Sequence, residues 1–173
     1  KIGMEMAKRA RGFDMKVLYH SRTRKSETEK EYGLKYASFN RVLTESDFIS
    51  IHVPLTPETT RFIGEKQLKM MKSSAILVNL SRGPVIDTGA LCKALTKGWI
   101  AGAGLDVFDP EPIPAGHPVL GLDNVVVLPH IGSASNRSRR EMHLLAARNL
   151  LAGLNGERLE ECANPEVYEF LGI

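Results

Sequence analysis

The sequence is short of the features that mark a secreted, membrane or metal-binding protein. Its two cysteines, Cys92 and Cys162, lie far apart and fit neither a CxxC motif nor a zinc spacing. We therefore expect two idle thiols, a reducing compartment and no metal site. No apolar run approaches the roughly 20 residues of a membrane span, and no secretory segment or initiating Met opens the chain. These absences predict a soluble, cytoplasmic protein.

Charge and aromatic residues are equally uninformative about large partners. The formal net charge is +3, and aromatic residues make up 6% of the chain. Such a small charge does not indicate binding to nucleic acid or to a membrane. The length of 173 residues is enough for one sizeable core.

Short apolar runs alternate with helical stretches along most of the chain. Several runs are apolar almost throughout, as strands covered on both faces by helices tend to be. The alternation predicts an α/β fold with a doubly wound parallel sheet. The expected strands lie at residues 16–20, 34–37, 47–53, 75–80, 101–107 and 124–130.

Capping residues mark the ends of the expected helices. Gly12, Gly33 and Gly98 follow helical stretches, and Ser38 and Asp87 stand where a helix should begin. A short helix is expected at 65–71. The longest helix is expected at 135–154, with an apolar stripe of Met142, Leu145, Ala146, Leu150 and Leu154. We expect a dinucleotide-binding domain at 1–134, and at 135–173 a helix and tail that return toward a substrate domain.

The stretch 108–123, FDPEPIPAGHPVLGLD, interrupts this regular pattern. Its four prolines and two glycines exclude a helix or a central strand. A long rigid loop after the carboxyl end of a strand is where such folds keep their active sites.

The first residues, Lys1, Ile2 and Gly3, fit the end of a phosphate-binding turn. In the Rossmann fingerprint the third glycine lets the helix pack close to the strand, and the pyrophosphate rests on the helix N-terminus. The first strand of that unit is absent from this sequence. We therefore expect an incomplete, Rossmann-like domain in which strands 16–20 and 47–53 lack their common neighbour.

The second expected strand ends in a basic segment. Arg22, Thr23, Arg24 and Lys25 follow it, where NAD-selective folds place an Asp or Glu. Cations and hydroxyls suit the 2′-phosphate of NADPH, so we expect NADPH in preference to NADH, with NAD as the alternative. A solvated basic loop would explain the same residues.

Ionisable residues follow three of the later expected strands. Arg82 comes after strand 75–80, Asp106 and Glu111 come at or after strand 101–107, and His130 follows the last strand. Each alone has an ordinary structural explanation. Because the carboxyl ends of parallel strands share one edge of the sheet, together they indicate a common crevice.

Three segments carry a resemblance to a known family. VNLSRGPVID, AGAGLDVFDPEP and LPHIGSAS resemble signatures of the D-isomer-specific 2-hydroxyacid dehydrogenases, over residues 1 to about 160. PHIGSAS followed by RSRR, and the helix ending LLAARNLLAGLNGE, are most similar to the glyoxylate/hydroxypyruvate reductase branch. Phosphoglycerate dehydrogenases and the C-terminal-binding corepressors are other members.

The resemblance implies a role for each candidate residue. His130 would be the acid/base that protonates the substrate carbonyl, and Glu111 would hydrogen-bond it and favour its charged form. Arg82 would grip the substrate carboxylate and carbonyl. Asp106 would hold the nicotinamide carboxamide. The other implied contacts are Lys1, Ile2, Pro54, Leu80 and Gly132 with the cofactor, and Ser133 with the substrate.

The implied activity is reduction of glyoxylate or hydroxypyruvate to a D-2-hydroxy acid, in a homodimer. Two alternatives stay open. One is a non-catalytic, nucleotide-sensing or dimerising module like the corepressors, and the other is an enzyme like D-3-phosphoglycerate dehydrogenase. Without the first strand and a substrate domain, this chain alone is expected to be inactive.

Overall fold

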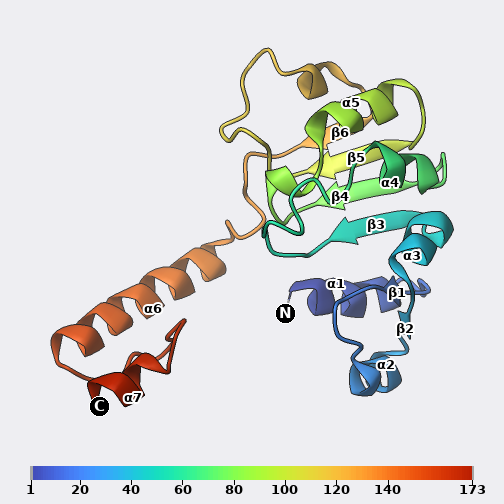
Figure 1. The fold of residues 1–173 in the computed structure, drawn as a ribbon. Coiled ribbons are helices and arrows are strands. Elements are labelled where there is room, and N and C mark those ends of the chain that lie inside the picture. Colours follow the sequence, from blue (N-terminus) through green and yellow to red (C-terminus); the bar gives the residue numbers. More distant parts are fainter. Residues whose placement is uncertain (1, 173) are drawn as a thin grey trace. The chain divides into compact units, whose positions relative to one another are not determined.

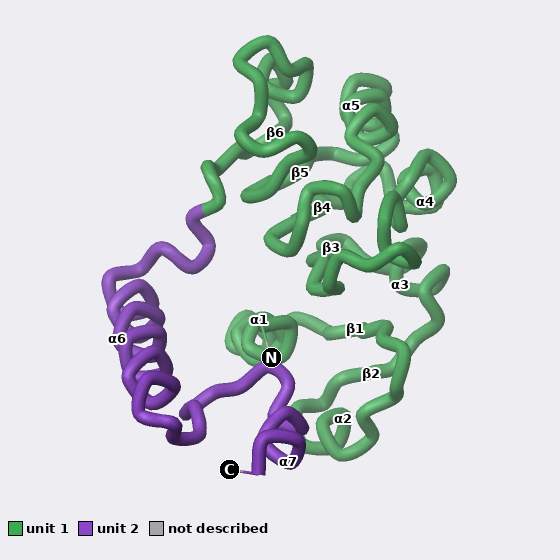
Figure 2. Tube along the Cα trace, turned by 60° about the vertical axis from the view of Figure 1, so that its left-hand side comes forward, with its two compact units in different colours: residues 1–130 green, residues 131–173 purple. Residues whose placement is uncertain are grey.

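A computed structural model gives the fold and describes residues 2–172. The chain forms two compact units, residues 1–130 and residues 131–173 (Figure 2). The boundary lies a few residues before the one expected from the sequence. Lys1, an expected cofactor contact, lies outside the described residues.

The first unit contains six parallel strands, one within each of the six segments expected from the sequence (Figure 1). This confirms the α/β class with a parallel sheet. The strands are β1 (Leu18–Tyr19), β2 (Lys35–Tyr36), β3 (Phe48–Ile51), β4 (Ile76–Asn79), β5 (Gly102–Leu105) and β6 (Val125–Val127).

The strands fall into a two-stranded sheet, β1-β2, and a four-stranded sheet of order β3-β4-β5-β6. All of these pairs are parallel, with Ile51 opposite Asn79 and Asn79 opposite Leu105. Within residues 2–172, no strand lies between β1 and β3 to join the two sheets. The break falls where the doubly wound order places the first Rossmann strand, as the sequence pattern predicts.

Helices connect the strands, and their ends match the capping residues. Ser38 accepts a hydrogen bond from the Arg41 amide at 3.3 Å, and Asp87 accepts one from the Ala90 amide at 2.9 Å. Gly33 closes its helix in the left-handed conformation, with φ 63°. The helices are α1 (Ile2–Arg11), α2 (Ser26–Tyr32), α3 (Phe39–Glu45), α4 (Glu65–Met70) and α5 (Thr88–Thr96).

The hydrophobic core lies between the four-stranded sheet and the helices α3, α4 and α5 (Figure 1). Leu77, at the middle of β4, is fully buried. Leucines from the three helices belong to the same core: Leu43, Leu68 and Leu91 are each no more than 1% exposed. Burial of this apolar surface holds β4 and β5 in place, and with them the loops that follow their carboxyl ends.

Two short 3-10 helices were not expected from the sequence. Gly83–Val85 (η1) follows β4, and Pro118–Gly121 (η2) lies inside the loop expected to exclude helix. That expectation was wrong for η2, because Pro118 occupies its first turn, where the missing amide costs nothing.

The second unit contains α6 (Asn136–Leu154) and α7 (Val167–Leu171). Ser135, where the helix was expected to begin, caps α6 by accepting a hydrogen bond from the Ser138 amide at 3.1 Å. Part of the expected apolar stripe is solvent-exposed: Met142 is 50%, Leu150 64% and Leu154 75% accessible. Among the described helices, none has the length and apolar content that a membrane crossing requires.

Candidate active site

An open hollow lies at the carboxyl ends of β3 and β4, beside the N-terminus of α1. Its volume is about 540 Å³. It brings together five expected contact residues, Ile2, Gly3, Pro54, Leu80 and Arg82. The complete lining is Ile2, Gly3, His52, Val53, Pro54, Leu55, Leu80, Ser81 and Arg82.

Gly3 stands where the helix approaches the sheet closely. A Cβ atom at this position would lie 3.2 Å from the Cβ, Cγ and Cδ2 atoms of His52. The glycine thus lets the start of α1 pack on the end of β3. The unpaired amides of a helix N-terminus face anions favourably, so this part of the hollow fits a pyrophosphate.

His52 forms part of the wall of the same hollow. Its Nε2 atom lies 2.9 Å from the Ser50 hydroxyl oxygen. Burial lowers the pKa of His52. The lowered pKa favours the neutral ring, which adds an apolar and hydrogen-bonding surface to the hollow.

The basic segment 21–25 is held in shape by its own polar contacts. The Arg24 guanidinium donates two hydrogen bonds to the Glu29 carboxylate, both at 2.8 Å. The Tyr19 hydroxyl donates to Glu29 at 2.8 Å and accepts from the Lys25 amide at 2.8 Å. Hydrogen bonds from Arg24 and then from Tyr19 lower the pKa of Glu29 to about 2. The positive charge of Arg24 is therefore already neutralised by the protein.

Arg22 has different surroundings. Its positive charge acts on Glu58. The pKa of Glu58 is lowered mainly by a hydrogen bond from the Thr56 hydroxyl, and the charge of Arg22 lowers it further. Glu58 belongs to the loop that follows β3, close in sequence to Pro54 in the hollow. Arg22 and Arg24 are thus neighbours in sequence that interact with different elements.

Arg82 is exposed and lies in the turn that follows β4. Its Nη1 atom donates to the Ser81 carbonyl at 2.7 Å. Its backbone carbonyl accepts a hydrogen bond at 2.9 Å from the side-chain amide of Asn79, the last residue of β4. The hollow thus has a guanidinium at one end, on a loop tied to the sheet.

Glu111 and His130 come together from segments far apart in sequence. The Nδ1 atom of His130 lies 2.9 Å from the Glu111 carboxylate. The two side chains are 48% exposed for His130 and 36% exposed for Glu111. His130 has a φ of 55°, which is uncommon for a residue other than glycine and is often found at functional sites. With Nδ1 held by the carboxylate, the Nε2 atom is left for another partner.

Asp106 follows β5 and is 2% exposed. Its backbone amide donates to the Asn79 carbonyl at 3.1 Å, which links the carboxyl ends of β4 and β5. Gly132 and Ser133, the remaining expected contacts, belong to the second unit. Their roles stay predictions.

Sequence reasoning missed three residues of this region: His52, Glu29 and Asn79. His52 ends an apolar strand, and Glu29 sits in an ordinary charged helix, so neither has a signal of its own. Asn79 did have a signal in the sequence, because it is a lone amide inside the apolar run AILVNL. A buried polar side chain needs hydrogen-bond partners, and these are at the site.

Comparison with known proteins places the chain in a family. Residues 1–132 match the model of the D-isomer specific 2-hydroxyacid dehydrogenase, NAD binding domain. The chain therefore belongs to the D-isomer specific 2-hydroxyacid dehydrogenase family, and its first unit corresponds to the domain that binds the nicotinamide dinucleotide.

Individual relatives agree with this assignment. A glyoxylate reductase of Thermococcus litoralis is 56% identical over 167 residues, which are 96% of this chain and 50% of that protein. The crystal structure of a D-lactate dehydrogenase with NAD+ from Lactobacillus jensenii is 38% identical, with a TM-score of 0.85, over 92% of this chain and 51% of that one. The crystal structure of a Thermus thermophilus protein is 47% identical, with a TM-score of 0.86, over 92% of this chain and 50% of that one. The chain thus spans about half the length of the relatives it matches.

Proposed function

We propose that this chain is the nucleotide-binding half of a reductase that converts glyoxylate or hydroxypyruvate to the D-2-hydroxy acid. The observation that carries the proposal is the His130–Glu111 pair at 2.9 Å, on the strand ends of a dinucleotide-binding domain. The name shared by curated relatives above 50% identity, glyoxylate reductase, supports the choice of substrate.

Arg82 binds the substrate in this proposal. Its planar guanidinium matches a carboxylate with a neighbouring carbonyl, and it draws electron density from that carbonyl. The wall of Pro54 and Leu80 and the start of α1 at Gly3 hold the cofactor beside it. When bound, NADPH supplies the hydride for the carbonyl carbon.

His130 delivers the proton. Its Nδ1–H donates to Glu111, which fixes the ring orientation, so the Nε2 proton is directed at the carbonyl oxygen. Asp106 accepts a hydrogen bond from the nicotinamide carboxamide and so sets which face of the ring is presented. The products are a D-2-hydroxy acid and the oxidised cofactor.

The test is oxidation of NADPH with glyoxylate, followed by loss of absorbance. We expect activity from the chain extended by an N-terminal half like that of its relatives, and none from residues 1–173 alone. Inactivity of both forms, with the cofactor still bound, would favour the non-catalytic nucleotide-sensing module instead. Efficient turnover of phosphorylated substrates only would favour the phosphoglycerate dehydrogenase-like alternative.

NADPH is the proposed cofactor because of segment 21–25. The cations Arg22 and Lys25 and the Thr23 hydroxyl supply charge and hydrogen bonds for a 2′-phosphate, while Arg24 shapes the segment through Glu29. Comparing kcat/KM for NADPH and NADH tests the preference. Arg22→Ala should reduce the NADPH-to-NADH ratio about tenfold, as loss of one charge-assisted hydrogen bond does. A wild-type preference for NADH would overturn this part of the proposal.

The second unit is proposed to pack on the N-terminal half, and the complete protein is proposed to be a cytoplasmic homodimer. The exposed leucines of α6 support a packing role for this helix. Light scattering of the extended form measures the dimer, and a monomeric mass at micromolar concentration would exclude it.

A further inference from the structure

Asn79 is the one fully buried amide side chain at the carboxyl end of β4 among the described residues. It is 1% exposed. Its Nδ2 donates to the Arg82 carbonyl at 2.9 Å, and its Oδ1 accepts from the amide and the hydroxyl of Ser81, both at 3.0 Å. One side chain thus closes the turn 80–82 from the inside.

These bonds hold two peptide groups of the turn, the one that joins Leu80 to Ser81 and the one that joins Arg82 to Gly83. The Ser81 amide is fixed before Arg82, and the Arg82 carbonyl is fixed after the side chain. The guanidinium itself donates to the Ser81 carbonyl at 2.7 Å. The position of the guanidinium therefore depends on a turn whose shape Asn79 sets.

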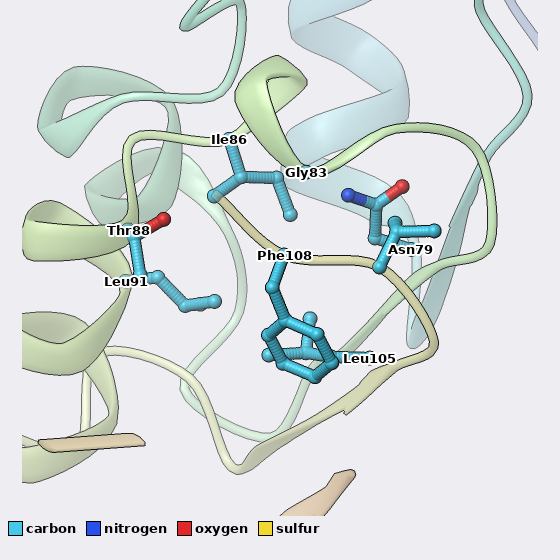
Figure 3. Close-up of a pocket in the computed structure, with 8 residues that line it drawn as sticks. Asn79, Gly83, Ile86, Thr88, Leu91, Leu105 and Phe108 are labelled. Carbon is cyan, nitrogen blue, oxygen red and sulfur yellow. The ribbon is translucent and has the colours of Figure 1, made fainter. Parts of the chain in front are cut away.

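Gly83 restrains the same turn from the other side. A Cβ atom here would lie 1.8 Å from the Phe108 carbonyl oxygen, so the two backbones touch. Only a void of about 10 Å³ remains beside them, lined by Asn79, Gly83, Phe108 and their neighbours (Figure 3). Such a space holds at most a single water molecule, so the turn has little room to shift toward Phe108.

We propose that Asn79 is a positioning residue for substrate binding: it holds the turn that aims Arg82 into the hollow. The proposal rests on the proposed function, in which Arg82 binds the substrate carboxylate. A purely structural amide would alter stability alone, whereas a positioning amide alters the KM for the keto acid.

Asn79→Asp is the sharpest variant because it replaces only the side-chain NH₂ group with an oxygen. The new side chain keeps the acceptor for Ser81 and loses the donor to the Arg82 carbonyl. As a carboxylate it repels that carbonyl, and as a carboxylic acid it donates to it. The neighbouring charged groups are Asp106, whose amide bonds to the Asn79 carbonyl, and Arg82 itself.

The measurements use the N-terminally extended protein. At about pH 8 we expect the KM for glyoxylate to rise about tenfold, the effect of one unpaired buried hydrogen-bonding group, with the KM for NADPH unchanged. The ratio of variant to wild-type KM should shrink as the pH is lowered and the carboxyl is protonated. Taking this ratio at each pH removes the titration that both proteins share.

Asn124→Asp is the matched control. The Asn124 amide also donates to backbone carbonyls, those of Ala101 at 3.2 Å and Leu95 at 3.4 Å, but at the start of β6 rather than beside Arg82. We expect lower stability and an unchanged KM for glyoxylate. Equal KM changes in the two variants, or a KM of Asn79→Asp within about twofold of wild type, would overturn the proposal.

A second readout does not need activity. In Asn79→Ala the Ser81 amide loses its acceptor, so its hydrogen exchange should quicken, while exchange in β5 stays slow. If the wild-type protein does not reduce glyoxylate, the proposed function fails, and this exchange still decides whether Asn79 holds the turn. Unchanged exchange at Ser81 would overturn the inference whatever the substrate.

Discussion

The first unit contains two regions that are held together in different ways. In the four-stranded region, residues 48–127, strands and helices enclose a continuous apolar core around Leu77. In the N-terminal region, residues 2–37, the structure shows no buried residue in α1 or α2. Its buried apolar residues among those described are only Leu34 and Ala37. Its polar contacts centre on Glu29, which binds Tyr19 and Arg24.

This difference in packing matches the roles proposed for the two regions, which are chemistry for one and cofactor selection for the other. The candidate residues for chemistry, Arg82, Asp106 and Glu111, follow strands of the region with the strong core, and His130 follows its last strand. The candidate residues for cofactor selection, such as Arg22, lie in the polar region. A rigid core keeps reacting groups in register, whereas an exposed polar segment tolerates changes that alter specificity.

The largest expected effect is on turnover. His130→Ala should lower kcat about 100- to 10,000-fold, because the proton donor is lost, while the ratio of NADPH to NADH use stays the same. His143→Ala, at an exposed position of α6, is the control and should change kcat by no more than about twofold. Steady-state kinetics with glyoxylate measure both. Near-normal turnover of His130→Ala would refute the assignment.

The next effect separates the two regions by stability. Leu77→Ala removes a fully buried side chain from β4 and should cost about 2–5 kcal/mol of unfolding free energy, since it leaves a cavity. Leu18→Ala, in half-buried β1, removes the same atoms and should cost less than about 1.5 kcal/mol. Urea unfolding gives both values. Equal costs would show that the N-terminal region has a core of its own.

A third substitution tests the contact between the regions. Gly3→Ala places a methyl group 3.2 Å from three side-chain atoms of His52, so either the His52 side chain or the start of α1 must shift to make room. We expect a rise of roughly tenfold in the Kd for NADPH, from about 1–3 kcal/mol of overpacking. Gly121→Ala meets no atom within 4 Å and serves as the control in the same calorimetric titration. If both variants bind alike, the start of α1 is not part of the cofactor site.

Much of the fold could be predicted from the sequence, because local signals agreed with the tertiary structure. The six apolar segments became strands, and Ser38 and Asp87 became helix caps. The helix α7 was missed, since it is a five-residue segment without a strong periodic pattern. The loop 108–123 was expected to lack helix, but a proline in the first turn is compatible with η2.

The candidate site could be predicted only as a set of strand ends. Parallel topology implies that Arg82, Glu111 and His130 share an edge of the sheet, but not which of them touch. Partner choice depends on side-chain geometry, so the Arg24–Glu29 pair and the bonds of Asn79 could not be read from spacing. A basic segment in the sequence says nothing about which of its cations is already neutralised.

The smallest expected effect is acid sensitivity, and it compares one carboxylate from each region. The pKa of Glu29 is lowered from its ordinary value of 4.5 to about 2 by Arg24 and then Tyr19, and that of Glu65 to about 2 by Lys69 and then Lys93. A lowered pKa in the folded state means that each carboxylate stabilises the fold above pH 4.5. This stabilisation is lost as the pH falls from 4.5 toward 2.

The two carboxylates differ in exposure, and this predicts which one matters. The Glu29 side chain is 12% exposed and that of Glu65 is 41% exposed, so water screens the Glu65 pairs more strongly. The Tm of the wild-type protein should drop between about pH 6 and pH 3. Because Gln does not titrate, this drop should be smaller in both variants, and the reduction should be greater in Glu29→Gln than in Glu65→Gln. Glu27→Gln, on the same helix as Glu29 but exposed, should leave the drop unchanged. A larger effect of Glu65→Gln would contradict the comparison. It would mean that the exposed Glu65 ion pairs contribute more to stability than the Glu29 contacts do, so the polar contacts would not be what holds the N-terminal region together.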